Sequence, residues 1–267
     1  MDSLEGCYGD SRETPDFIYS YRVRTGELHW TKLATGEKAE LMLPSYRFMQ
    51  CSSWCALPEK SLFFTGGYDS SAAFQVVCID VLKDFSVTEK DPMLSARCRH
   101  ISTYSNIHIY VIGGHGDTGV LTECERYSTV DNKWEGLPAL LKGVYHSSVL
   151  MHEGSQTLFV LGGCDGSMGT QLIQGLSVES LEWRALELKL PSESYYIANF
   201  KSDLGYYFIQ DSCLYSLDAD SELICLIKVA DHHAQSFFGP SYYSKGLLCA
   251  SNDYGAVQHF QIEALTS

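Results

Sequence analysis

The chain has 267 residues, of which 45% are hydrophobic, 12% aromatic and 19% charged. This composition is typical of a folded globular protein and excludes a largely disordered chain. Its 33 acidic residues against 19 basic ones leave a formal net charge of −14, which disfavours nucleic acid and membrane surfaces as partners because both carry negative charge.

Cysteine usage and the absence of export signals predict the compartment. No apolar run approaches the ~18 residues that a membrane-spanning helix needs, and the first residues contain neither a basic leader nor an apolar stretch. Most of the ten cysteines lie in apolar, strand-like runs, and no Asn-x-Ser/Thr sequon occurs. We therefore expect a soluble protein of the reducing cytoplasm, with the nucleus as the alternative.

Taken in chain order, the predicted elements are all short strands. Residues 21–30 read as two strands around a Thr-Gly turn. Next come three near-continuous apolar runs, typical of strands buried on both faces, and each leads to a glycine pair. These runs are 62–65 before Gly66 and Gly67, 107–112 before Gly113 and Gly114, and 157–161 before Gly162 and Gly163. Fainter strands follow at 206–209 and 247–250.

The glycine pairs mark a repeat, since they are 47 and 49 residues apart. In the second unit Tyr127 lies 13 residues after Gly114, and Trp134 lies seven residues further on. Leu176 and Trp183 have the same spacings in the third unit. A four-stranded unit cannot bury both its faces alone, so such repeats stack around an axis with large side chains filling the gaps between them.

A glycine pair, a tyrosine and a tryptophan at these spacings resemble the kelch repeat, most strongly over residues 97–183. The chain is thus similar to the kelch domains of BTB–kelch and F-box–kelch proteins. The resemblance implies an all-β, kelch-type β-propeller of four-stranded antiparallel blades, with residues 1–267 forming a single domain. Units begin near residues 1, 46, 97, 144, 194 and 235, which favours six blades, with five as the alternative.

The resemblance also implies where a partner binds. In kelch substrate receptors, arginines, tyrosines and serines just before the innermost strand of each blade contact a partner peptide at the channel mouth. The matching residues here are Arg47, Arg97, Tyr145, Tyr195, Ser236 and Phe237. The loops after the glycine pairs flank the same mouth with Tyr68, Asp69, His115, Asp117, Asp165 and Ser167.

Two interpretations of these residues are open at this stage. Arginines at the mouth would pair with carboxylates of an acidic peptide, and changing Arg47 and Arg97 together to glutamate would then abolish binding. Alternatively, Arg97 and Arg99 pair with acidic neighbours of the same chain, and the tyrosines pack between blades with satisfied hydroxyls.

No catalytic constellation, metal site or cofactor site is predicted. The Ser-x-Asp-x-Gly-x-Thr-Trp turn of sialidases, the phosphate loop and the Gly-x-Ser-x-Gly elbow are all missing. Cys51 and Cys55 are four residues apart, but no second pair stands at zinc-finger spacing, and no histidine, cysteine and tyrosine pattern suits a copper oxidase.

The sequence therefore predicts a non-enzymatic protein-interaction module that binds a partner protein or peptide. The resemblance adds the substrate receptor of a ubiquitin ligase as a specific form of this function. A cytoskeletal or trafficking scaffold is the alternative, and a sialidase-like or oxidase-like propeller enzyme is the disfavoured third reading.

Overall fold

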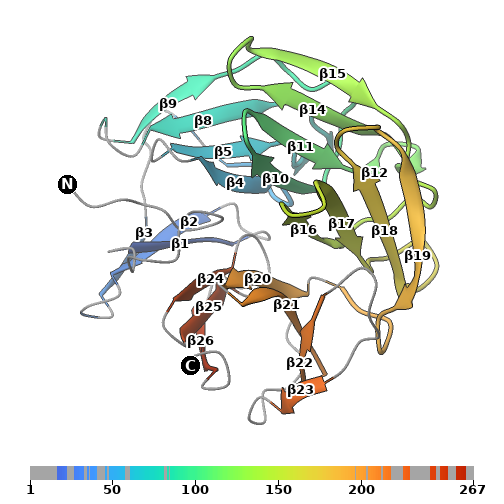
Figure 1. Cartoon of the computed structure of the whole chain (residues 1–267). Helices are drawn as coiled ribbons and strands as arrows, with labels where there is room; N and C mark the ends of the chain where they lie inside the picture. The colour runs from blue at the N-terminus through green and yellow to red at the C-terminus, as the bar shows by residue number, and fades with distance from the viewer. Residues whose placement is uncertain are drawn as a thin grey trace.

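The computed structural model describes residues 17–22, 27–32, 35, 37–40, 46, 48–57, 61–80, 83, 85–195, 197–202, 204–211, 213–217, 225–228, 241–244, 247–251 and 257–262. Within these ranges the regular elements are β-strands, and they form sheets arranged around a common centre (Figure 1). The expectation of an all-β fold built from antiparallel sheets is confirmed.

Four sheets contain four strands each, paired antiparallel in sequence order. The first has β4 (Ser53–Leu57), β5 (Ser61–Thr65), β8 (Val76–Asp80) and β9 (Ser86–Glu89). The second has β10 (Ile101–Ser105), β11 (His108–Ile112), β14 (Cys124–Ser128) and β15 (Lys133–Leu137). The third has β16 (Ser148–His152), β17 (Thr157–Leu161), β18 (Leu172–Ser177) and β19 (Trp183–Lys189). The fourth has β20 (Ala198–Ser202), β21 (Gly205–Gln210), β22 (Cys213–Ser216) and β23 (Cys225–Lys228).

Two sheets have three strands in the described residues. One, near the N-terminus, has β1 (Phe17–Arg22), β2 (Glu27–Lys32) and β3 (Lys38–Glu40). The other, near the C-terminus, has β24 (Tyr242–Ser244), β25 (Leu247–Ser251) and β26 (Val257–Gln261). The number of blades, six or five, stays a prediction, as does the single-domain boundary.

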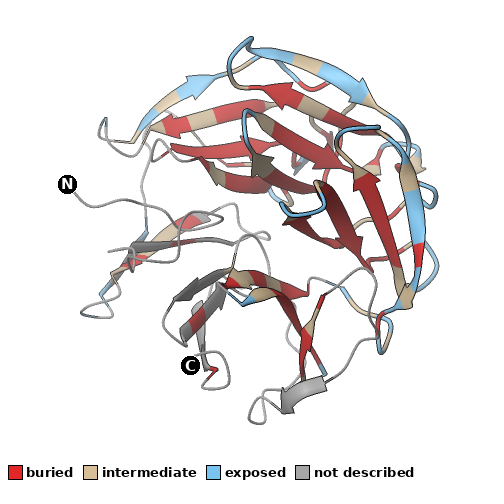
Figure 2. Cartoon of the chain, viewed as in Figure 1, coloured by how far each residue is buried: buried red, intermediate tan, exposed pale blue. Residues whose placement is uncertain are grey.

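The sheets pack side by side through their innermost strands. Strand β4 contacts β10, β10 contacts β16, β16 contacts β20, and β20 contacts β24. Figure 2 shows that the inner strands are buried and that the outermost strands carry most of the exposed positions. Strands β5 and β17 are buried at every residue, because they have sheet on both faces, and their near-continuous apolar sequences reflect this position.

The two rims of the sheets are built from different loops. Since the strands of a sheet run antiparallel in sequence order, the loop between its second and third strands lies on the same rim as the segment that leads to the next sheet. We call this the glycine rim; it includes residues 48–52, 66–75, 90–100, 113–123, 138–147, 162–171, 190–195 and 211. The opposite rim comprises residues 106–107, 129–132, 153–156, 178–182 and 204.

Two short hairpins extend the glycine rim. They are formed by β6 (Tyr68–Asp69) with β7 (Ser71–Ala72), and by β12 (His115–Gly116) with β13 (Gly119–Val120). All six glycines of the predicted pairs have positive φ, which confirms that the repeat marks a backbone conformation that other residues rarely adopt. Each glycine pair directly follows the second strand of its sheet, on the glycine rim.

The predicted aromatic anchors fill the spaces between sheets. Tyr127 is buried, and its ring centroid lies 5.3 Å from that of Phe63 in the preceding sheet. The indole Nε1–H of Trp134 donates to the carbonyl of Asp91 at 2.8 Å, and that of Trp183 donates to the carbonyl of Pro138 at 2.8 Å. In two successive sheets, the outermost strand is therefore hydrogen-bonded to the segment that precedes that sheet.

Replacing Trp183 with phenylalanine is expected to lower the free energy of unfolding by about 1 kcal/mol, because the aromatic contact is kept while the indole hydrogen bond is lost. Urea unfolding followed by fluorescence and circular dichroism measures the change. Trp134→Phe removes the equivalent bond of the neighbouring sheet and is expected to behave alike; an unchanged midpoint in both variants would contradict the assigned role.

Candidate functional site

The backbone hydrogen bonds of the glycine pairs define which residues are equivalent in successive sheets. The N–H groups of Gly67, Gly114 and Gly163 donate at 2.9 Å to the carbonyls of Arg97, Val144 and Ser194, respectively. These three acceptors therefore occupy equivalent positions. The residues that follow them, Cys98, Tyr145 and Tyr195, form the next equivalent set.

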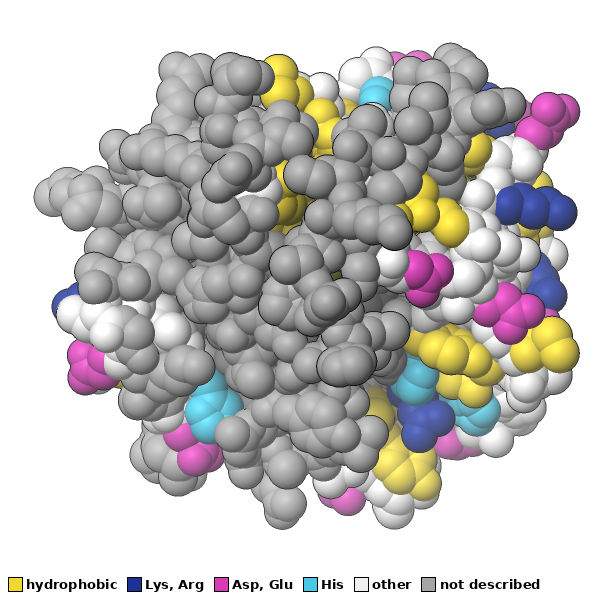
Figure 3. Space-filling view, turned by 90° about the horizontal axis from the view of Figure 1, so that it is seen from below, with side chains coloured by type: hydrophobic (Ala, Val, Ile, Leu, Met, Phe, Trp, Pro, Cys, Tyr) yellow, Lys and Arg dark blue, Asp and Glu magenta, His cyan; other side chains and the backbone are white. Residues whose placement is uncertain are grey.

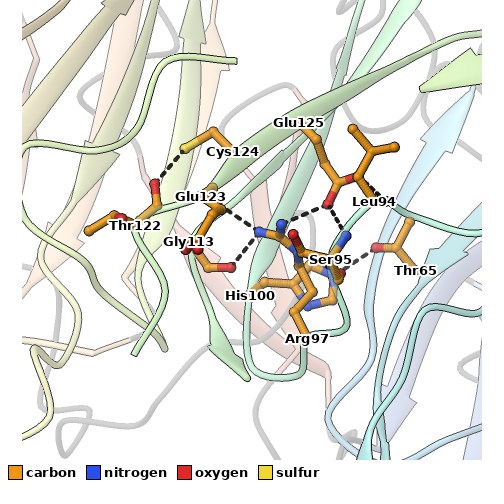
Figure 4. A network of polar contacts seen from close by, with 10 residues as sticks. All are labelled: Thr65, Leu94, Ser95, Arg97, His100, Gly113, Thr122, Glu123, Cys124 and Glu125. Carbon is orange, nitrogen blue, oxygen red and sulfur yellow. Dashed lines mark hydrogen bonds and ion pairs between the residues drawn. The ribbon is translucent and has the colours of Figure 1, made fainter. Parts of the chain in front are cut away.

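Arg97 is buried, so the prediction that it contacts a partner is wrong. Its side chain has no exposed surface and lies between two sheets (Figure 4). One guanidinium nitrogen donates to the carbonyls of Gly113 and Glu123, both at 2.8 Å, and another pairs with the Glu125 carboxylate at 2.6 Å. Burial lowers the pKa of Arg97, while the neighbouring Glu125 opposes this shift. The interpretation that Arg97 pairs with an acidic neighbour is the correct one.

Glu125, which lies on β14, the third strand of its sheet, makes the remaining hydrogen bonds of this network. Its carboxylate also accepts the N–H of Leu94 at 2.7 Å and the N–H of Ser95 at 3.3 Å. The ion pair therefore fastens the segment that links two sheets, and its two charges are satisfied inside the protein. Arg97 and Glu125 are structural residues.

Arg99, two residues further on, is the arginine that the glycine rim exposes. Cys51, Arg99 and His146 are equivalent, and each has a left-handed backbone with φ of 54°, 55° and 55°. The N–H of Arg99 donates to the carbonyl of Cys51 at 2.9 Å, and the N–H of His146 donates to the carbonyl of Arg99 at 3.0 Å. This main-chain relay links three successive sheets where their innermost strands begin.

The Arg99 side chain lies against an aromatic cluster. Its Cζ atom is 5.9 Å from the centroid of the Tyr145 ring, within the range of a cation–π contact. The Tyr145 ring meets the rings of His115 and His146 edge-on, with centroids 5.7 Å and 4.8 Å away. The structure thus brings Tyr145 and His115, both named from the sequence, into contact, and Arg99 and His146, which were not named as binding residues, lie against them.

Three groups at this place have pKa values that are shifted in favour of their uncharged forms. Burial lowers the pKa of His146 to about 3, and the positive charge of Arg99 and the neighbouring His115 add to the shift. The hydrogen bond with Cys164 raises the pKa of Tyr145, and desolvation adds to it. Burial raises the pKa of the Cys98 thiol to about 11. At neutral pH these shifts favour a neutral His146 imidazole, a neutral Tyr145 phenol and a protonated Cys98 thiol.

Tyr195 and Tyr68 are accessible on the same rim. Tyr195 is 42% exposed and Tyr68 is 46% exposed. Tyr195 lies over the loop of the preceding sheet, since a Cβ built on Gly169 would be 3.4 Å from its hydroxyl oxygen. Asp69, next to Tyr68, is exposed as well.

The other predicted loop residues take part in hydrogen bonds that shape the rim. Asp117 accepts the N–H of Ala72 at 2.9 Å, which joins two neighbouring loops. Asp165 pairs with Lys142 at 2.6 Å and accepts bonds from the N–H and the hydroxyl of Ser167 at 3.0 and 2.9 Å. These contacts hold the pKa of Asp165 well below its usual range. Arg47, Ser236 and Phe237 lie outside the described residues.

Large hydrophobic side chains are exposed on both rims, and more of them lie on the glycine rim, which also has many more described residues. Of the nine large hydrophobic residues that are exposed in the described part of the chain, six lie there: Tyr68, Phe74, Leu94, Leu141, Met168 and Tyr195. The other three, Ile107, Val130 and Leu204, are on the opposite rim. Figure 3 shows that, on the face seen there, hydrophobic side chains lie beside charged and histidine side chains.

Two further features are absent from the described ranges. There, no three histidine, cysteine, aspartate or glutamate side chains are grouped so that they could hold a metal ion. Nor does any helix of these ranges have the length and apolar character to cross a membrane.

Comparison with known proteins points to one repeat family. Residues 96–141 match the model of the kelch motif. Human Kelch-like protein 38 is 29% identical over 193 residues, which cover 70% of this chain and 31% of that protein. Mouse Kelch-like protein 23 is 28% identical over 147 residues, which cover 53% of this chain and 25% of that protein. The chain thus spans about a third or less of the length of these relatives.

The fold is also found among solved structures. The structure of YjhT is similar with a TM-score of 0.62 at 14% sequence identity, covering 79% of both chains. At this identity the likeness concerns the fold alone. The matched motif, the kelch-like relatives and the ring of antiparallel four-stranded sheets together identify the chain as a kelch-repeat β-propeller.

Proposed function

We propose that the chain is a protein-interaction module that binds a segment of a partner protein on the glycine rim, over Arg99, Tyr145 and Tyr195. The observation that carries this proposal is that the Tyr145 ring contacts Arg99, His115 and His146 on that rim, where the side chain of Tyr195 is also exposed. Tyrosine and arginine are also residue types that anchor protein interfaces.

The rigidity of the rim supports the proposal. Main-chain bridges pair Ala73 with Arg97, Cys98 with His115 and Tyr145 with Cys164. Loops that are fixed before binding lose little conformational entropy when a partner docks, so more of the contact energy appears as affinity.

A non-enzymatic role agrees with the titration behaviour of the cluster. The raised pKa of Cys98 and the lowered pKa of His146 leave a thiol without nucleophilic charge and an imidazole that is a poor base at neutral pH. Binding through shape and aromatic contact suits such groups better than acid–base chemistry does.

The finer role of substrate receptor in a ubiquitin ligase is a proposal by resemblance to the kelch-like relatives. It requires a ligase-binding domain beside the propeller, and it predicts that the bound partner becomes ubiquitinated. A cytoskeletal or trafficking scaffold would bind its partner without this consequence. The cytoplasmic location is proposed in the same way, supported by seven described cysteines that are free thiols.

Replacing Tyr145 and Tyr195 together with alanine is expected to weaken binding about 30-fold or more, since anchoring aromatic residues carry most of an interface's energy. The probe is a peptide selected from a phage-displayed random library against the unaltered protein, and its Kd is measured by fluorescence anisotropy. Ile107→Ala with Val130→Ala removes exposed apolar groups from the opposite rim and serves as the control. Equal Kd values for the tyrosine variant and the unaltered protein would refute binding on the glycine rim.

A further inference from the structure

We infer that the partner segment is basic as well as apolar, with lysine or arginine side chains beside its hydrophobic ones. This inference rests on the proposed function, and it names the chemistry of the ligand for the same rim. It replaces the acidic peptide expected from the sequence, which depended in part on Arg97.

Acidic side chains recur at the loop tips of the glycine rim. In three successive sheets the loop after the glycine pair contains an aspartate: Asp69, Asp117 and Asp165. In the fourth sheet Asp211 follows directly after β21 at the same rim. Glu193, exposed in the segment before that sheet, adds another negative charge. Asp69, Asp117 and Asp211 are exposed, whereas Asp165 is paired with Lys142. A partner that crosses several loops therefore meets an exposed carboxylate at three of the four.

Part of the positive charge on this rim is already paired. Arg97 is buried against Glu125 at 2.6 Å, and Lys142 pairs with Asp165 at 2.6 Å. Lys90 and Arg99 are the other basic residues of the rim. Arg99 lies over the Tyr145 ring. In the described part of the rim Lys90 and Arg99 are outnumbered by the acidic residues outside the ion pairs, which are Asp69, Asp91, Asp117, Glu123, Glu193 and Asp211. The described rim is therefore negative overall.

At two places on the rim an exposed tyrosine and an exposed acidic residue are close in sequence. Tyr68 is next to Asp69, and Tyr195 is two residues from Glu193. A purely apolar segment would leave these exposed carboxylates facing apolar groups, and an acidic segment would be repelled by them. A segment that interleaves basic and apolar side chains complements both features, and the net charge of −14 steers it toward the protein.

Charge reversal tests the inference with a matched control. Asp69→Lys with Glu193→Lys changes the glycine rim, whereas Glu179→Lys with Glu182→Lys makes the same change in net charge on exposed residues of the opposite rim. Peptides selected from the random library against the unaltered protein are expected to be enriched in lysine and arginine. Their Kd should rise about tenfold in the first variant and stay within about twofold in the second, with the affinity falling as salt is raised.

The outcomes separate the two proposals. Selected peptides that are neutral or acidic, but that still require Tyr145 and Tyr195, would overturn the inference and leave the proposed function standing. Equal weakening by the two charge-reversal variants would also overturn the inference, because it indicates a general attraction to an acidic protein. Selected peptides whose Kd is insensitive to the two tyrosines would instead contradict binding on this rim.

Discussion

Replacing Glu125 with alanine is expected to lower the free energy of unfolding by about 3 to 5 kcal/mol, because the Arg97 guanidinium is left buried without its counter-charge. Both side chains are at most 2% exposed, and they pair at 2.6 Å. The variant also loses the acceptor for the N–H groups of Leu94 and Ser95. Urea unfolding at equilibrium measures the loss.

The exposed pair of Arg126 and Glu135 provides the control. Glu135 is 53% exposed, so Glu135→Ala is expected to cost less than about 1 kcal/mol. A double variant, Arg97→Met with Glu125→Leu, removes both buried charges and is expected to recover most of the loss. If Glu125→Ala and Glu135→Ala had the same small effect, the buried pair would have no special structural role.

Replacing Gly113 with valine is expected to destabilise the protein by about 3 kcal/mol or more. Gly113 has a φ of +56°, a conformation that is costly for a β-branched residue. A Cβ at this position would lie 2.5 Å from the carbonyl oxygen of Val144 and 3.2 Å from Cδ1 of Leu140. Strain and overlap therefore add, and the melting temperature should fall accordingly.

Gly136 is the matched control for this substitution. It lies in the outermost strand β15 without a positive φ, and a Cβ there would meet nothing within 4 Å. Gly136→Val is expected to leave stability unchanged or slightly raised, since valine favours strands. A Gly113→Val variant as stable as Gly136→Val would show that the glycine pair is not needed for the close approach between sheets.

The strands and the glycine pairs were predictable from the sequence because each depends on local physical demands. A strand with sheet on both faces must be apolar throughout, as β5 and β17 are. A positive φ against a neighbouring carbonyl admits little other than glycine, as at Gly113. Burial on both faces and a positive φ therefore restrict the residue types at these positions, and the restriction is visible in the sequence.

The candidate site was harder to predict because backbone direction decides which side chain reaches the surface. In extended chain, residues two apart point the same way, so Arg97 and Arg99 look alike from sequence. The left-handed φ of 55° at Arg99 breaks that alternation, and Arg97 turns inward to Glu125. The spacing of the glycine pairs indicates the segment before each innermost strand, but no residue pattern there predicts the left-handed conformation of Arg99.

The main-chain relay through Cys51, Arg99 and His146 does not depend on which side chain stands at each position. Its hydrogen bonds use only N–H and C=O groups, and cysteine, arginine and histidine all adopt the required conformation. The join between repeats therefore tolerates different side chains at its most central positions. Substitutions at these positions can therefore change the surface of one repeat while the main-chain hydrogen bonds between repeats are kept.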